Sequence, residues 1–246
     1  MPDTGTLPRP AVAAAQQTEH FDVLIVGAGI SGVGGAYHLT TQCPGTSFVV
    51  LETQESFGGT WITHKYPGIR SDSDLYTFGY RFKPWTTAPI ATAAEILKYM
   101  GEVIDENDLG PHIRYRHRID AAAWSSETNL WTIDATNTAT GEPVRITTNF
   151  LWMCQGYYRH SEGYTPQWDG IETFKGTIVH PQTWPTDLDY TGKKCRRHRL
   201  GRHGGDAHSG DGGRRRPRHY AAALADLFQD RPQRGRDRRR VAGAGH

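Results

Sequence analysis

Apolar and polar positions between Phe21 and Glu52 follow the pattern of a strand, a turn, a helix and a second strand. An apolar run covers Val23–Val26 and is followed by a glycine-rich turn. A helical stretch continues to Leu39, and a second apolar run, Phe48–Leu51, ends at Glu52. This order of runs predicts a βαβ unit with parallel strands.

Further along the chain, the pattern predicts one more helix and an antiparallel meander. Residues Ala91–Leu109 place apolar side chains at helical spacing, which predicts an amphipathic helix packed on the core. Polar turn residues separate three strand-like runs, at Ile113–Trp124, Leu130–Thr136 and Pro143–Thr148. A short apolar run, Phe150–Cys154, ends shortly before a glycine. The expected fold class is α/β, a Rossmann-like domain with a parallel sheet, helices and an antiparallel β-meander.

Glycine-rich stretches after Glu52 predict loops and not regular elements. They cover Ser56–Trp61 and Tyr66–Asp74. Loops that follow the second strand of a nucleotide-binding unit often reach over the cofactor. In the first meander run, arginines at positions 114, 116 and 118 alternate with other residues, which predicts a solvent-facing side.

Length and composition exclude some classes of protein. The 246 residues suffice for one large domain or two modest ones. They contain no apolar run of 18 residues, so no membrane span is expected. Residues 1–19 are expected to be a disordered leader, because they have neither a basic start nor a long apolar core. The three cysteines lack metal-binding spacing, which favours free thiols in a reducing cytoplasm.

The glycine turn has the spacing of a dinucleotide-binding fingerprint. Gly27 permits the tight turn, Gly29 lets the backbone approach a pyrophosphate, and Gly32 lets the helix pack on the strand. The helix N-terminus offers N–H groups to the phosphates. Glu52 stands where a carboxylate accepts hydrogen bonds from a ribose, which favours FAD or NAD and disfavours NADP.

Charge divides the chain sharply at Cys195. Fourteen arginines and five aspartates follow this position, with no lysine or glutamate. The preceding part has fourteen basic and 21 acidic residues, so its net charge is −7 against +9 for the tail. The tail, residues 195–246, is expected to be disordered.

Three patterns together resemble the flavin-dependent Baeyer–Villiger monooxygenases of the flavin-containing monooxygenase superfamily. The resemblance covers about Glu19 to Lys194, and the loop from Gly68 to Asp74 is most similar to the mycobacterial ethionamide-activating kind of these enzymes. The patterns are Gly27-x-Gly29-x-x-Gly32, Gly59-x-Trp61 with Tyr66-Pro67-Gly68-x-x-x-Asp72, and Phe174-x-Gly176-x-x-x-His180-x-x-x-Trp184-Pro185.

The resemblance implies a monooxygenase that uses FAD and NADPH. Such an enzyme inserts one oxygen atom from O2 into a ketone, giving an ester or lactone, or oxidises sulfur in thioethers and thioamides. Small molecules and O2 are the implied partners, and nucleic acid is not among them.

The resemblance also assigns roles to individual residues. Asp72 would lie at the active site near the flavin, and His180 would be a linker histidine that couples domain motion to catalysis. From the residues alone, His180 is as readily a structural histidine, since it stands beside Pro181 in a turn. The cofactor-binding residues would be Gly27, Gly29, Ser31 and Gly32 at the pyrophosphate, Glu52 at the ribose, Gly59, Thr60 and Trp61 at the flavin, Arg70 and Ser71 beside Asp72, and Ile119 at the adenine.

The resemblance stops after Lys194, where the family has an NADPH-binding glycine-rich unit and later a catalytic arginine. Reading the codons for Cys195 onward one base out of register permits an apolar strand and a Gly-x-Gly-x-x-Ala turn. We therefore expect an incomplete FAD-binding domain at residues 20–194. Residues 195–246 would be an out-of-frame tail that replaces the NADPH domain, which would leave a catalytically inactive fragment.

Two alternatives compete with this interpretation. The chain could be a non-catalytic FAD-binding module whose basic tail binds nucleic acid. It could also be another flavin oxidoreductase such as a disulfide reductase, but it has no closely spaced cysteine pair.

Overall fold

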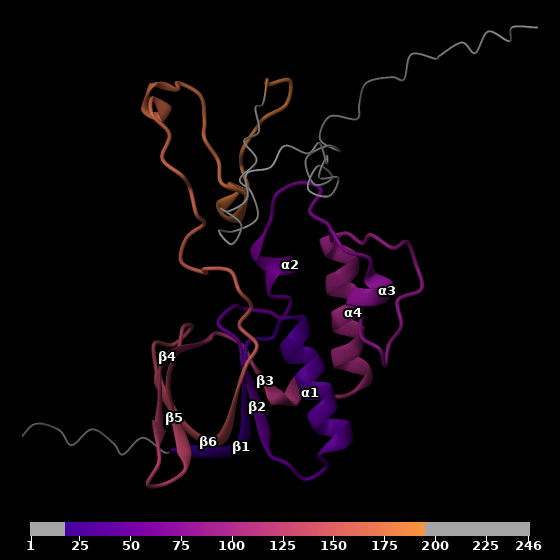
Figure 1. Cartoon of the computed structure of the whole chain (residues 1–246), viewed down its shortest axis with the longest axis vertical. Helices are drawn as coiled ribbons and strands as arrows, with labels where there is room; N and C mark the ends of the chain where they lie inside the picture. Colours follow the sequence, from indigo (N-terminus) through magenta and orange to yellow (C-terminus); the bar gives the residue numbers. More distant parts are fainter. Residues whose placement is uncertain (1–17, 195–246) are drawn as a thin grey trace, which may run out of the picture.

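The computed structural model of the chain describes residues 18–194. Six strands form one mixed sheet in the order β3-β2-β1-β6-β5-β4 (Figure 1). The strands β3, β2, β1 and β6 run parallel to their neighbours, and β6, β5 and β4 form an antiparallel meander. The strands are β1 (Glu19–Val26), β2 (Phe48–Leu51), β3 (Ile113–Arg114), β4 (His117–Ser125), β5 (Leu130–Asn137) and β6 (Pro143–Met153).

Two longer helices and several single turns accompany the sheet. The helix α4 has a capping box, in which Thr92 and Glu95 exchange hydrogen bonds, and this fixes its start. The helices are α1 (Ile30–Gln42), α2 (Thr60–Thr63), α3 (Leu75–Phe78) and α4 (Ala93–Glu106), with the 3₁₀ turns η1 (Gly110–His112), η2 (Ile171–Thr173) and η3 (Pro181–Thr183).

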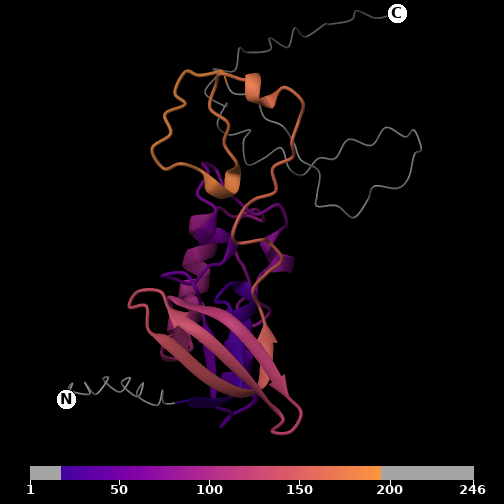
Figure 2. The same ribbon diagram turned by 90° about the vertical axis from the view of Figure 1, so that its left-hand side faces the viewer.

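The central strands are buried on both faces. Val23 and Ile25 point toward α1 and α4, where they join one apolar cluster with side chains such as Val33 and Met100. On the opposite face the meander folds back over the sheet, as Figure 2 shows. There Leu24, Val49 and Leu51 pack with Ile133, Ala135 and Ile146. The alternation of faces along β1 explains why its apolar run is continuous.

The predicted βαβ unit and meander are confirmed, but three boundaries were wrong. The run Ile113–Trp124 is two strands, because Arg116 has φ of 59° and turns the chain from β3 into β4. The runs from Pro143 and Phe150 form one strand, β6, which pairs first with β5 and then only with β1. The segment Ser56–Trp61, predicted as loop, includes the start of the single helical turn α2, whereas α3 begins directly after the predicted loop Tyr66–Asp74.

The N-terminal boundary also needs correction. Glu19 is the first residue of β1, and its carboxylate accepts two hydrogen bonds from the Arg114 guanidinium at 2.7 and 2.6 Å. Arg114 is therefore half-buried in an ion pair and not simply part of a solvated face. The predictions for the leader before residue 18 and for the tail after residue 194 lie outside the described residues.

Beyond β6 the chain forms an arm of loops and two 3₁₀ turns, residues 155–194, which extends away from the sheet past α2 (Figure 1). Gln182 Nε2 donates to Arg159 O at 2.8 Å and so ties the two sides of this arm together. Among residues 18–194, no helix has the length and apolar character needed to cross a membrane.

Candidate functional site

The turn between β1 and α1 has no room for a side chain at Gly27, nor does the adjoining helix have room for one at Gly32. Gly27 has φ of 95°, and its N–H donates to Leu51 O at 2.8 Å. A Cβ at Gly27 would approach Cys154 O to 3.0 Å, and one at Gly32 would come within 1.8 Å of Gly27 O. The turn can therefore form only because glycine stands at both positions.

A second glycine segment lies directly against this turn. Gly58 N–H donates to Ala28 O at 3.0 Å. Gly59 has φ of 54°, and a Cβ there would lie 3.1 Å from the Gly29 Cα. The structure thus brings Gly29 and Gly59, which belong to separate sequence motifs, into backbone contact beside the start of α1. The result is a surface of bare backbone.

The N-terminus of α1 has the chemistry of an anion site. Its N-cap is Gly29, which provides no side-chain hydrogen bond, and its first turn carries no acidic residue. The N–H groups of a first helical turn have no acceptor within the helix, and the helix dipole places partial positive charge there. Ser31 lies in this turn. A phosphate is the ligand that such a helix end favours.

Glu52 is buried beside the glycine turn. Its Oε2 accepts the Ala28 N–H, and its Oε1 accepts the Gln54 N–H, both at 2.8 Å. Its backbone is held as well, since Glu52 N–H donates to Arg114 O and Glu52 O accepts the His117 N–H. The carboxylate is therefore fixed at the carboxyl end of β2.

The helix α2 follows the second glycine segment and carries Thr60 and Trp61. The Trp61 ring meets the Phe78 ring of α3 edge-on at 6.4 Å between centroids. Thr60 O is 3.1 Å from Nδ1 of His64. Burial lowers the pKa of His64, the bond to Thr60 opposes this shift, and His180 adds to it.

The loop with Arg70, Ser71 and Asp72 is held against the start of α4. Ser71 is buried, its N–H donates to Ala91 O at 2.8 Å, and its hydroxyl accepts the Ala91 N–H at 3.1 Å. The Ser71 hydroxyl thus fixes the loop. Arg70 Nε donates to Gly68 O at 3.3 Å, and Asp72 Oδ1 accepts the Ser73 hydroxyl at 3.5 Å.

Two predicted residues lie away from the glycine turn. Ile119 is on β4 and packs against the apolar cluster on the face opposite α1. His180 caps the 3₁₀ turn η3 in the arm, where its Nδ1 accepts the Gln182 N–H at 3.1 Å. The capping bond fixes the Nδ1 of His180 as an acceptor and so leaves any proton on Nε2.

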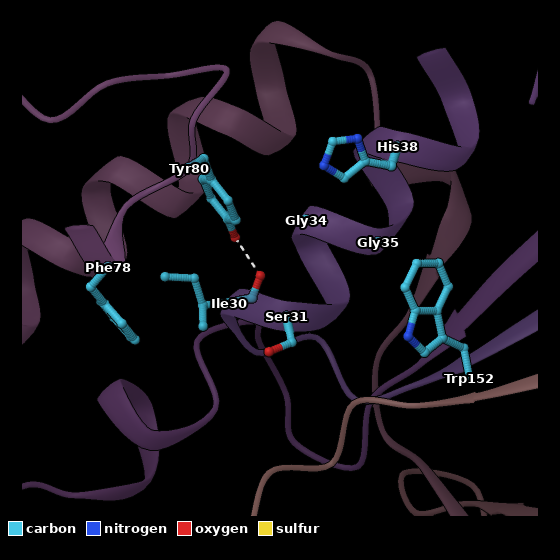
Figure 3. Close-up of a pocket in the computed structure, with 8 residues that line it drawn as sticks. All are labelled: Ile30, Ser31, Gly34, Gly35, His38, Phe78, Tyr80 and Trp152. Carbon is cyan, nitrogen blue, oxygen red and sulfur yellow. Dashed lines mark hydrogen bonds between the residues drawn. The ribbon is translucent and has the colours of Figure 1, made fainter. Parts of the chain in front are cut away.

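A hollow of about 350 Å³ lies beside α1 (Figure 3). Tyr80 and Trp152 stand on its sides, and bare glycine backbone forms part of its floor. Sequence reasoning missed Tyr80 and His64, since neither belongs to a glycine motif. The end of β6 also reaches the turn, because Cys154 O would lie 3.0 Å from a Cβ at Gly27. The lining residues are Ile30, Ser31, Gly34, Gly35, His38, Phe78, Tyr80 and Trp152.

Known sequences match the chain over most of its described part. A profile of the NAD(P)-binding Rossmann-like domain matches residues 25–87. The FAD-containing monooxygenase EthA of Mycolicibacterium smegmatis is 54% identical over 178 residues, which are 72% of this chain and 36% of the relative. EthA of Mycobacterium tuberculosis is 49% identical over 177 residues, again 72% of this chain and 36% of the relative. The chain spans about a third of the length of these curated relatives.

Solved structures agree with the sequence matches. An oxidized steroid monooxygenase bound to NADP superimposes with a TM-score of 0.57 and 32% identity, over 70% of this chain and 33% of that chain. The OTEMO complex with FAD and NADP gives a TM-score of 0.56 and 30% identity, over 70% and 32%. By sequence and by structure, this chain is therefore related to a part of the FAD-containing monooxygenases that makes up about a third of their length.

Proposed function

We propose that the chain binds FAD and serves as the flavin-holding part of a Baeyer–Villiger-type monooxygenase. With NADPH as reductant, the whole enzyme would insert one oxygen atom from O2 into a ketone or oxidise sulfur in a thioether or thioamide. The observation that carries this proposal is the contact of Gly29 with Gly59 beside the N-terminus of α1, together with the burial of Glu52. The names of the relatives and neighbours support it.

The bare backbone around Gly29 fits a pyrophosphate. The absence of side chains lets both phosphates approach the N–H groups of the first turn of α1, and the helix dipole favours their charge. The Ser31 hydroxyl lies in the same turn and would add a donor. These residues would bind and orient the dinucleotide.

Glu52 would hold the adenosine ribose. Each carboxylate oxygen accepts one backbone N–H and keeps a further acceptor site, which a ribose hydroxyl can use. A phosphate on that ribose would instead place its charge against a buried carboxylate. The site therefore favours FAD over a dinucleotide with a 2′-phosphate.

Residues of α2 and the following loop would surround the flavin. Thr60 and Trp61 begin α2 directly after the contact with the glycine turn, so they would line the ring. Asp72, with Arg70 and Ser71, would lie on the side where the nicotinamide docks, and His180 would transmit motion through the arm. When bound, FAD supplies the redox and oxygen chemistry of the reaction.

The binding proposal is tested by titrating FAD into the full chain and following the quenching of flavin fluorescence. We expect saturable binding that weakens about tenfold or more in Glu52→Gln. The glutamine side chain has one acceptor oxygen in place of two, so its NH2 group would face a backbone N–H donor. Glu55→Gln is the matched control, because Glu55 is exposed and pairs with Arg116 at the surface.

Failure of the folded chain to bind FAD would contradict the proposal, and circular dichroism would confirm folding. Equal FAD affinity of wild type and Glu52→Gln would contradict the role of Glu52 alone. By itself the 246-residue chain is expected not to oxidise NADPH in the presence of a ketone. Such oxidation would overturn the assignment of the chain as the flavin-holding part only.

A further inference from the structure

The helix α1 is intrinsically weak for its position. It contains Gly32, Gly34 and Gly35 within 13 residues, and its N-cap is also a glycine without a side-chain bond. Each glycine inside a helix costs about 1 kcal/mol relative to alanine. The direction in which its first turn points therefore depends on contacts from outside the helix.

Tyr80 supplies such a contact. Its hydroxyl donates to the carbonyl oxygen of Ile30, the first residue of α1, at 2.7 Å, as Figure 3 shows. Its ring lies on the helix where Gly34 leaves the backbone bare, and a Cβ at Gly34 would approach the ring to 3.0 Å. Burial strongly raises the pKa of Tyr80, so the phenol keeps its proton and remains a donor.

Tyr80 is itself held in place from the side of α4. Its N–H donates to the Tyr99 hydroxyl at 2.7 Å. Its ring stacks on Tyr99 and on Phe82, with centroids 5.5 and 4.8 Å apart, and Phe82 stacks in turn on Tyr37 of α1. Tyr80 thus connects α4, whose start is fixed by a capping box, to α1, which lacks a side-chain cap.

We propose that Tyr80 is a positioning residue for the dinucleotide. It holds the first turn of α1 so that the N–H groups of this turn face the pyrophosphate, and Gly34 provides the space that the ring requires. The inference rests on the proposed binding of FAD. Tyr80 would act through the helix, without contact to the cofactor.

The test compares three variants of the full chain. Tyr80→Phe keeps the ring stack and removes only the hydroxyl, and we expect the Kd for FAD to rise about 2- to 10-fold. Gly34→Ala pushes the ring from the helix, and we expect it to weaken FAD binding although alanine favours helix. The control is Tyr76→Phe, which also removes one tyrosine bond to a backbone carbonyl, Thr87 O, but at the surface of α3. Its Kd should equal that of wild type.

Amide hydrogen exchange without FAD gives a second readout. In Tyr80→Phe, the amides of the first turns of α1 should exchange faster, while those of α4 remain unchanged. The inference would be overturned if the α1 amides of Tyr80→Phe exchanged at the same rate as those of wild type. An unchanged Kd for FAD in Tyr80→Phe or in Gly34→Ala would overturn it as well. If wild type fails to bind FAD, the proposed function fails, and the exchange data still decide whether Tyr80 holds the helix.

Discussion

Single glycines decide whether the turn between β1 and α1 can form. At Gly32, a Cβ would lie only 1.8 Å from the carbonyl oxygen of Gly27, a backbone atom that cannot rotate away. At Gly110, by contrast, a Cβ would meet nothing within 4 Å. The two positions differ in their surroundings, and this contrast gives a direct test.

Gly32→Ala is expected to lower the free energy of unfolding by at least about 1–3 kcal/mol, because the helix must move off the strand. It should also abolish FAD binding. Gly110→Ala should change stability by less than about 0.5 kcal/mol, as substitutions without contacts do. Chemical denaturation of both variants measures the difference, and equal stability of the two would contradict the steric argument.

At residue scale, the sequence predicted the positions that depend on local spacing. Gly27, Gly29, Gly32 and Glu52 follow from one strand–turn–helix–strand pattern, and the structure places them together. Tyr80 escaped prediction, since its role depends on a contact with Ile30 fifty positions away. No local pattern announces a tertiary hydrogen bond of this kind.

At the scale of elements, hydrophobic periodicity identified α1, α4 and the strand-forming runs, but it missed the short helices α2 and α3 and the point where one run divides into two strands. The split of Ile113–Trp124 depends on backbone bonds from Arg116 N–H to Gln54 O and from His117 N–H to Glu52 O. These bonds arise only once β3 has joined β2. A left-handed arginine gives no signal in the sequence, because glycine or asparagine is the usual residue there.

The contact of α2 with the arm should depend on pH through His64. Its ring packs at 5.4 Å from the Tyr158 ring, and burial keeps its pKa below the ordinary value of 6.5. The folded state thus binds fewer protons than the unfolded state. Stability is fully present above about pH 6.5 and falls as the pH drops from there toward the folded pKa.

We expect the melting temperature of wild type to fall between pH 7.5 and 5.5 by more than that of His64→Phe. The phenyl ring keeps the aromatic packing but has no proton to bind. Thermal unfolding of both proteins across this range measures the effect. Parallel curves would show that the pKa shift of His64 contributes nothing to stability.

At the scale of the whole molecule, the sheet is covered unevenly. β6 pairs with β5 only as far as Thr148, and beyond it the outer edge of β6 has no strand partner among residues 18–194. Phe150 and Met153 on this edge are 58% and 56% exposed. An open, apolar edge strand is a site of self-association.

Phe150→Lys is expected to reduce self-association of the purified chain without lowering its melting temperature, because the side chain is mostly exposed. Sedimentation velocity at increasing concentration measures this. Arg145→Gln, also on β6 but in the part paired with β5, serves as the control. If Phe150→Lys associates with itself as strongly as wild type, the unpaired edge of β6 is not the cause of self-association.

The central place of β1 has a consequence for biosynthesis. Its first partner, β2, follows closely, whereas its second partner, β6, pairs with it across 127 positions of sequence. At about 5–20 residues per second, a ribosome needs roughly 6–25 s to deliver that second strand. For this time the nascent chain carries an unpaired Val23–Val26 edge, and a chaperone that binds extended apolar segments would find its target there.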